Sequence, residues 1–183
     1  MILLLDLCYE RETLSKYEFV YPIADTLKRA GARFEIQHFK QADERKQEEY
    51  SKIILCGTAL KDTAYAKRLD LFSWLKTCEK PVLGICAGMQ VIGSVFGGCM
   101  VSQMAIGLET LEIVAATPLL GEPRQIQVYH LHNFGVTMPK GFLLAAGSAA
   151  FVKAFRHREK PIYGIIFHPE VRNRWVLERF LKL

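Results

Sequence analysis

The sequence predicts an α/β fold, in which a mostly parallel central sheet is flanked by helices and carries a smaller antiparallel β extension. Two observations support this prediction. In the first half of the chain, short apolar runs of β type alternate with amphipathic helical stretches, as in a parallel sheet that is covered by helices. After residue 98 the β-like runs follow one another with turns between them, which is typical of antiparallel strands.

The opening strand is the continuous apolar run Ile2–Leu5, and Asp6 closes it. Such a run is expected of a parallel strand that is buried on both faces. Pro22 can open a helix through Ala30, with Gly31 at its end. The same alternation predicts further strands at Arg33–His38, Lys52–Cys56 and Pro81–Cys86, and helices at Asp62–Cys78 and Ala87–Phe96.

The second half is dominated by β-like runs, with turns at residues 121–123 and 139–141. These runs are Leu108–Val114, Gln125–His130, Leu143–Ser148, Val152–His157 and Ile162–Phe167. We expect them to form the antiparallel extension, and we expect a short helix at Arg172–Leu181 to close the chain.

The length of 183 residues is close to the ~150 of a typical domain, so we expect residues 1–183 to form a single domain. Half of the residues are hydrophobic, which is enough apolar surface for a folded core. No apolar run approaches the ~18 residues of a membrane span, and Met1–Leu5 lacks the features of a signal peptide. We therefore expect a cytoplasmic protein with no membrane partner.

The charge and the cysteines exclude several classes of function. The net charge is +5, but the basic residues are spread along the chain, so we expect no nucleic-acid partner. Five cysteines without a CxxC pair form neither a disulfide framework nor a zinc framework. His130 and His132 face the same side of a strand but lack a third ligand nearby in sequence. We expect no metal and no cofactor.

The most informative segment runs from Gly84 to Gly88, where a predicted strand passes through G-x-C-x-G into a predicted helix. This is the pattern of a nucleophile elbow, a sharp turn that lifts the Cys86 side chain above the edge of the sheet. The N-terminus of the following helix also favours a thiolate. The alternative is that Cys86 is an inert buried thiol between two packing glycines.

A second motif supplies a base for that thiol. His168 ends an apolar run, and Glu170 follows two residues later, where its carboxylate can orient the imidazole ring. A thiol, an imidazole and a carboxylate are the nucleophile, base and orienter of covalent acyl transfer. The two motifs together favour a catalytic Cys–His–Glu triad over a structural histidine.

At these residues the chain resembles the class I glutamine amidotransferases, whose glutaminase domain carries G-x-C-x-G-x-Q and, further on, F-H-P-E. The resemblance extends from the opening strand to the final helix and implies a flavodoxin-like fold. It also implies that Cys86 is the nucleophile, His168 the general base and acid, Glu170 the orienter, and Gln90 a helix residue that helps to hold the substrate glutamine. The segment Lys160–Gly164 looks most like the glutaminase subunits of archaeal-type two-subunit GMP synthases.

The resemblance also identifies the expected substrate-binding loops. The amide of Ala87 is one expected oxyanion donor, and the second is expected from the loop that begins with Gly57 and Thr58. Thr58 stands where the family has a second glycine, and a left-handed backbone is disfavoured for a β-branched residue, so we expect low activity without a partner. His132 matches the histidine of the S-H-x-D motif of GMP synthase glutaminases, whereas Leu131 and Phe134 do not match.

The resemblance implies that glutamine is the small-molecule substrate and that ammonia passes to a separate, ATP-dependent synthase subunit, which could be that of GMP synthase. Two alternatives remain open from the sequence. One is a stand-alone cysteine hydrolase of the same fold that acts on γ-glutamyl or other amides. The other is a non-catalytic relative that serves as a regulatory module.

Overall fold

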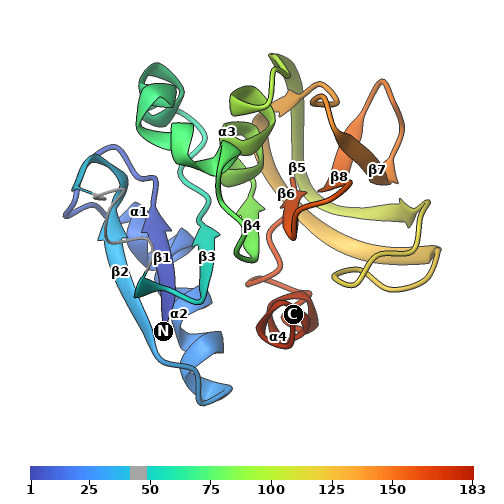
Figure 1. Ribbon diagram of the computed structural model, residues 1–183. Coiled ribbons are helices and arrows are strands. Elements are labelled where there is room, and N and C mark those ends of the chain that lie inside the picture. The colour runs from blue at the N-terminus through green and yellow to red at the C-terminus, as the bar shows by residue number, and fades with distance from the viewer. Residues whose placement is uncertain (42–48) are drawn as a thin grey trace.

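The structure is a computed structural model in which residues 1–41 and 49–183 are described. Nine strands form one sheet in the order β2-β1-β3-β4-β9-β8-β7-β5-β6 (Figure 1). The strands are β1 (Ile2–Asp6), β2 (Phe34–His38), β3 (Lys52–Leu55), β4 (Val82–Ile85), β5 (Met100–Ile113), β6 (Arg124–Val136), β7 (Phe142–Gly147), β8 (Val152–His157) and β9 (Ile162–Ile165). The helices are α1 (Ser15–Phe19), α2 (Tyr21–Arg29), α3 (Ala87–Val95) and α4 (Trp175–Leu181), with 3₁₀ segments η1 (Phe39–Gln41) and η3 (Ala64–Lys76).

The first half of the sheet is parallel, as the alternation of strands and helices predicts. Strand β1 pairs with β2 on one side and β3 on the other, and β4 joins β3. The carboxyl ends of these strands therefore meet at one edge of the sheet, which is the upper edge in Figure 1. The predicted α/β class, with its flavodoxin-like parallel sheet, is confirmed.

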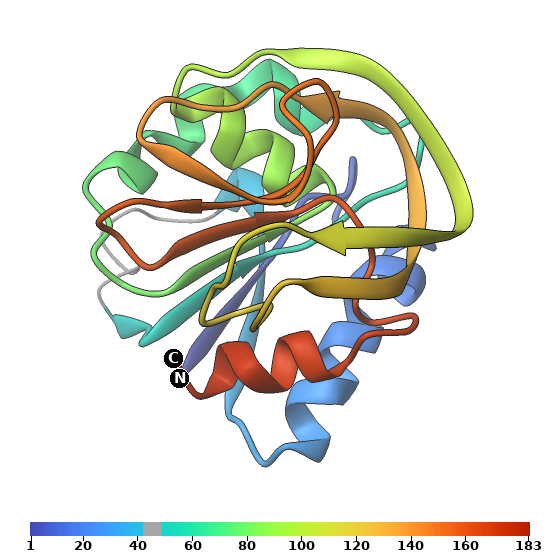
Figure 2. The same ribbon diagram turned by 90° about the vertical axis from the view of Figure 1, so that its right-hand side faces the viewer.

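The antiparallel extension is also present, but its border lies elsewhere than predicted. Strand β9 is antiparallel to β8 and parallel to β4. The strand in the run Ile162–Phe167 therefore joins the parallel half of the sheet to the antiparallel half, and does not belong to the extension alone. Beyond β8 and β7, the long hairpin of β5 and β6 curls around one side of the molecule (Figure 2).

The sheet separates two apolar cores because side chains alternate between the faces of a strand. Leu4 and Ile54 face the core that α2 and α4 cover, with Ile23, Leu27 and Phe180 among its members. Leu3, Leu5 and Leu55 face the core that η3 and α3 cover, with Phe72, Leu75 and Ile92. This double cover explains why the parallel strands are continuous apolar runs.

The structure differs from the predictions at four elements. Strand β5 begins at Met100 rather than Leu108, and β6 continues to Val136, because polar residues and Gly107 interrupt the apolar pattern there. The helix predicted at Asp62–Cys78 is instead the 3₁₀ segment η3, which is kinked at Arg68. Helix α1 was not predicted, since five residues are too short to show a helical period.

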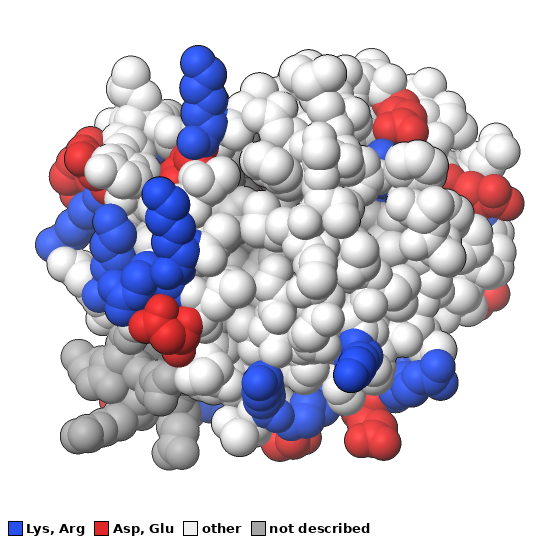
Figure 3. All heavy atoms as spheres, turned by 90° about the horizontal axis from the view of Figure 1, so that it is seen from above, with Lys and Arg blue, Asp and Glu red and all other residues white. Residues whose placement is uncertain are grey.

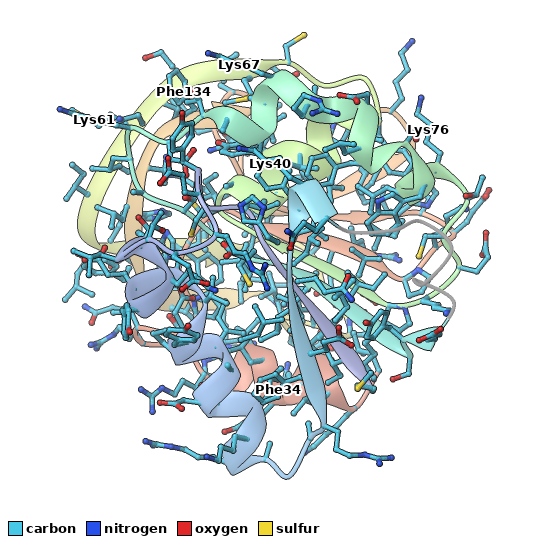
Figure 4. All side chains as sticks on the ribbon, turned by 90° about the vertical axis from the view of Figure 1, so that its left-hand side faces the viewer. Phe34, Lys40, Lys61, Lys67, Lys76 and Phe134 are labelled. Atoms are coloured by element: carbon cyan, nitrogen blue, oxygen red, sulfur yellow. The ribbon has the colours of Figure 1, made fainter. Side chains whose placement is uncertain are left out.

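Both termini lie at the lower end of the molecule in Figure 1, opposite the carboxyl ends of the parallel strands. In Figure 4 the first residue of β2, Phe34, lies at the lower end of the molecule. Lys61, in the segment after β3, lies at the upper end together with Phe134. Within residues 1–41 and 49–183, no helix is both long enough and apolar enough to cross a membrane.

Candidate active site

Cys86 occupies a strained turn between β4 and α3. Its backbone angles are φ 51° and ψ −104°, and it is the only non-glycine residue with a positive φ in the described part of the chain. A cysteine adopts this conformation only where the surroundings enforce it, and such strain is concentrated at functional sites. The predicted elbow geometry is therefore present at Cys86.

The two glycines that flank the elbow allow backbones to approach closely. A β-carbon placed on Gly84 would lie 2.5 Å from the Gly88 carbonyl, and one placed on Gly88 would lie 2.3 Å from the carbonyl oxygen of Leu55. Real β-carbons do not approach backbone oxygens so closely. Helix α3 thus packs against β3 and β4 at a distance that only glycine permits, which explains the G-x-C-x-G pattern.

His168 and Glu170 follow β9, the parallel neighbour of β4, so the chain delivers them to the same edge of the sheet as Cys86. The Nδ1 atom of His168 lies 2.8 Å from Oε1 of Glu170, and both side chains are 1% exposed. The backbone amide of His168 donates to the Tyr129 carbonyl at 2.9 Å. The imidazole is therefore held from both its backbone and its ring.

Charge outweighs burial in setting the protonation of His168. Burial alone lowers the pKa of this imidazole, but the negative charges of Cys86 and Glu170, and its hydrogen bond with Glu170, hold the pKa well above its ordinary value. The Nε2 atom is buried and has no acceptor within hydrogen-bonding distance in the described residues. With Nδ1 bound to Glu170, Nε2 is the ring atom left to exchange a proton with the sulfur.

Gly57 lies directly against the imidazole. A β-carbon placed on Gly57 would lie 2.9 Å from Cε1 and 3.5 Å from Nδ1 of His168. Thr58 follows it and is buried, and its hydroxyl donates to Oδ2 of Asp62 at 2.7 Å. The left-handed backbone considered for Thr58 is absent, since Cys86 is the one described non-glycine residue with a positive φ.

A small pocket opens beside Cys86 between the loop after β3, the start of α3 and strand β6. It holds about 20 Å³ of solvent space, which corresponds to roughly one water molecule. Its lining residues are Thr58, Ala59, Leu60, Asp62, Tyr65, Cys86, Ala87, Gln90, Leu131, His132, Asn133 and Phe134. The sulfur of Cys86 is 3.7 Å from the Leu131 carbonyl oxygen. A larger molecule can reach the sulfur only if part of this wall moves.

The Gln90 side chain is fixed at both ends of its amide group. Nε2 donates to the Phe134 carbonyl at 2.7 Å, while Oε1 accepts a hydrogen bond from the Tyr65 hydroxyl. Because a backbone carbonyl can only accept, Nε2 must face Phe134 and Oε1 must face Tyr65. The two partners therefore determine which way the amide points in the pocket.

The structure brings together every residue that the sequence singled out as part of a site. Cys86, Thr58, Ala87, Gln90 and His132 line one pocket, and Glu170, His168 and Gly57 form a contact chain beside it. Ala87 begins α3, where the first amides of a helix have no acceptor within the helix.

The sequence does not indicate three further residues of the pocket wall, namely Asp62, Tyr65 and Asn133. The helical pattern places Tyr65 on an apolar face together with core residues. Asp62 stands in a segment without a recognisable motif, and Asn133 occupies the position that the S-H-x-D motif leaves free, so only their positions in space reveal them.

His132 belongs to a polar chain that leads from the pocket through buried His130 to the exposed Glu109. Its Nε2 is 3.2 Å from Nδ1 of His130, whose Nε2 is 3.1 Å from Glu109, and Glu109 also pairs with Lys153. Burial, followed by the charge of Lys153, lowers the pKa of His130 to about 3 and that of His132 to about 4. Both rings are therefore neutral near pH 7. Within the described ranges, no group of three metal-ligating side chains is assembled.

The arrangement has the parts of an acyl-transfer site. The sulfur of Cys86 faces the pocket, a histidine oriented by a carboxylate can exchange its proton, and helix amides lie next to the sulfur. Such a site can attack a carbonyl carbon, stabilise the oxyanion and protonate the leaving group.

Comparison with known proteins identifies relatives of this chain. The model of the family described as glutamine amidotransferase class-I matches residues 15–181. A protein of Pyrococcus furiosus that is named as one subunit of the glutamine-hydrolyzing GMP synthase is 32% identical over 163 residues, which cover 85% of this chain and 86% of that protein. Its namesake from Archaeoglobus fulgidus is 38% identical over 103 residues, covering 54% and 56%.

Solved structures show the same fold. A Thermoplasma acidophilum protein, described as a candidate GMP synthase subunit, has a TM-score of 0.83 at 24% identity and covers 100% of this chain and 93% of its own. A glutamine amidotransferase from Thermotoga maritima has a TM-score of 0.71 at 24% identity and covers 99% and 80%. At these identities the likeness shows the fold alone.

Proposed function

This chain belongs to the class I glutamine amidotransferase family, and from that membership we propose that it is a glutaminase subunit in which Cys86, His168 and Glu170 perform the hydrolysis. The observation that carries the proposal is the strained Cys86 elbow beside a His168–Glu170 pair whose atoms are 2.8 Å apart. Glutamine is hydrolysed to glutamate and ammonia.

In the first half of the reaction, the sulfur of Cys86 attacks the carboxamide carbon of glutamine. His168 takes the thiol proton at Nε2, and Glu170 stabilises the resulting imidazolium through Nδ1. The negative charge that develops on the carboxamide oxygen is stabilised by the Ala87 amide and by an amide of the Gly57–Thr58 loop. His168 then returns the proton to the leaving nitrogen, so that ammonia departs and a thioester remains.

In the second half, water replaces the sulfur. His168 removes a proton from water, the resulting hydroxide attacks the thioester carbonyl, and the sulfur leaves as thiolate and recovers its proton. The products are glutamate and the original enzyme. Gln90 and His132 line the pocket in which this substrate is held.

A separate synthase subunit is the proposed consumer of the ammonia. The relatives that cover most of this chain are named as one subunit of a glutamine-hydrolyzing GMP synthase, a name that implies another subunit. We infer that this chain likewise passes ammonia to an ATP-dependent partner, of which a GMP synthase subunit is the first candidate.

The test uses a glutamine-like diazoketone and intact-mass measurement. One adduct at Cys86, its absence in Cys86→Ala, and ammonia release from glutamine that the same substitution abolishes would support the proposal. Labelling of Cys56 or Cys99 with Cys86 unmodified would refute the nucleophile. Co-purification with the synthase subunit, followed by measurement of glutamine-dependent amidation, tests the partner.

A further inference from the structure

The side chains that line the pocket beside Cys86 include one carboxylate and no lysine or arginine. Of the residues that line it, Asp62 alone is acidic, and neither lysine nor arginine is among them. Within residues 1–41 and 49–183, Asp62 also makes no ion pair with a lysine or an arginine. The negative charge of Asp62 is therefore not neutralised by a cation of the protein.

Two hydrogen bonds hold this carboxylate in place. The Thr58 hydroxyl donates to Oδ2 at 2.7 Å, and the backbone amide of Ala64 donates to Oδ1 at 3.1 Å. A carboxylate offers about four acceptor positions, so about two remain for a ligand. Asp62 is half-buried, which leaves its charge less screened than on an open surface.

The proposed reaction supplies a cation that suits this carboxylate. Free glutamine carries an α-ammonium group, whereas an amide inside a peptide chain does not. An ammonium that enters the pocket needs a charged acceptor, since burying it without one is costly. Of the lining side chains, Asp62 alone supplies this charge.

We propose that Asp62 binds the α-ammonium group of the substrate and thereby selects a free amino acid over an amide that lacks this group. The inference rests on the proposed glutaminase function and deepens it. Under this proposal, the hydroxyl of Thr58 orients the carboxylate that receives the ammonium.

The test compares the rates at which three electrophiles modify Cys86 in the purified chain. The first is the amino-acid diazoketone 6-diazo-5-oxo-norleucine, the second is its analogue without the α-amino group, and the third is iodoacetamide. Asp62→Asn keeps the size of the side chain and removes its charge. We expect it to slow the amino-acid diazoketone on the order of 10- to 100-fold, as loss of a charge-assisted hydrogen bond implies. The other two rates should change little.

A purely structural role for Asp62 predicts a different pattern. If Asp62 only fixes the loop, Asp62→Asn slows all three reagents alike and Thr58→Val reproduces the effect; either result would overturn the proposal. Under the proposal, Thr58→Val retains the preference for the amino-acid reagent, because the charge remains. Asp70→Asn, the same substitution at an exposed position of η3, is the matched control and should alter no rate.

Failure of the proposed function looks different from failure of this inference. If the natural chain is not labelled at Cys86 by either diazoketone, the glutaminase assignment is wrong. If the natural chain and Asp62→Asn are both labelled at Cys86 with the same preference for the amino-acid reagent, the glutaminase assignment stands and Asp62 does not bind the ammonium.

Discussion

Gly57 and His168 are in direct contact, since a β-carbon placed on Gly57 would lie 2.9 Å from Cε1 of the imidazole. The imidazole cannot yield freely, because Glu170 holds its Nδ1 atom at 2.8 Å. The backbone of the loop after β3 thus serves as one wall of the histidine site.

Gly57→Ala should therefore displace the imidazole from the sulfur of Cys86. A misplacement of a catalytic group by ~1 Å can cost about 10²-fold in rate, so we expect glutaminase activity to fall by roughly that factor. The measurement is ammonia release from glutamine. Near-UV circular dichroism should match that of the natural chain, and undiminished activity would show that the ring accommodates the methyl group.

The charge of Glu170 raises the pKa of His168, and replacing that charge should lower it. We expect Glu170→Gln to bring the His168 pKa down in an NMR titration of the imidazole, measured in a Cys86→Ala background so that the sulfur contributes no charge. The raised pKa also links the folding stability to pH, and the sign of this dependence is definite. A histidine whose pKa is raised by folding adds stability that is complete below ~6.5 and is lost as the pH rises through the folded pKa.

The same substitution should lower turnover less than Cys86→Ala or His168→Ala. A neutral amide can still orient the ring, whereas nucleophile and base have no substitute. Ammonia release by the three folded variants provides the order. An equally inactive Glu170→Gln would give Glu170 a direct part in the chemistry.

Gly88→Ala tests the elbow as a packing device. The added β-carbon would lie 2.3 Å from the carbonyl oxygen of Leu55 in β3, a rigid backbone atom that cannot move aside. Overpacking of this kind costs about 3 kcal/mol of unfolding free energy, measured by urea denaturation. A change below about 0.5 kcal/mol, as at an ordinary surface site, would show that α3 can shift away from the sheet.

The elbow and the catalytic histidine could be predicted because each belongs to a motif of contiguous residues. Cys86 stands between two glycines at the end of an apolar run, and His168 ends another such run two residues before Glu170. That the two meet follows from the parallel pairing of β4 and β9. The sequence pattern placed Ile162–Phe167 with the antiparallel runs, because the residues of a strand do not show whether its neighbour in the sheet runs parallel or antiparallel to it.

The rest of the pocket could not be predicted, because it depends on contacts between distant segments. Asp62 is recognised only by its place beside Cys86, and Tyr65 by its bond to Gln90, 25 residues along the chain. Periodicity also failed in η3, where the kink at Arg68 interrupts the helical turn. The large uncharged part of the face at the carboxyl ends, with basic side chains at its left and lower edges in Figure 3, is likewise visible only in space.

Tyr65→Phe should destabilise the protein through an unpaired amide. Loss of the hydroxyl leaves Oε1 of Gln90 buried without its donor, which costs about 1–3 kcal/mol of unfolding free energy. Tyr17→Phe, at a side chain that is 68% exposed, is the matched control and should stay within about 0.5 kcal/mol. Equal unfolding midpoints in urea for the two variants would show that Gln90 finds another donor.

The Thr58 side chain restrains the loop that must supply an oxyanion donor. Its hydroxyl is bound to Asp62 at 2.7 Å, and its β-branch limits rotation of the peptide that joins it to Gly57. The pocket beside it holds about 20 Å³, so glutamine enters only when this wall moves. The isolated chain should therefore release ammonia slowly, and a synthase partner that favours the open loop should accelerate it.

Thr58→Gly removes both restraints and should make the isolated chain faster at releasing ammonia from glutamine. Thr58→Ser separates them, because it keeps the hydroxyl bond to Asp62 and lacks only the methyl branch. If the methyl branch is the main restraint, the rate of Thr58→Ser approaches that of Thr58→Gly. If the hydroxyl bond to Asp62 is the main restraint, the rate of Thr58→Ser stays near that of the natural chain. A Thr58→Gly variant that is no faster than the natural chain, each assayed alone, would mean that threonine does not hold the resting enzyme back.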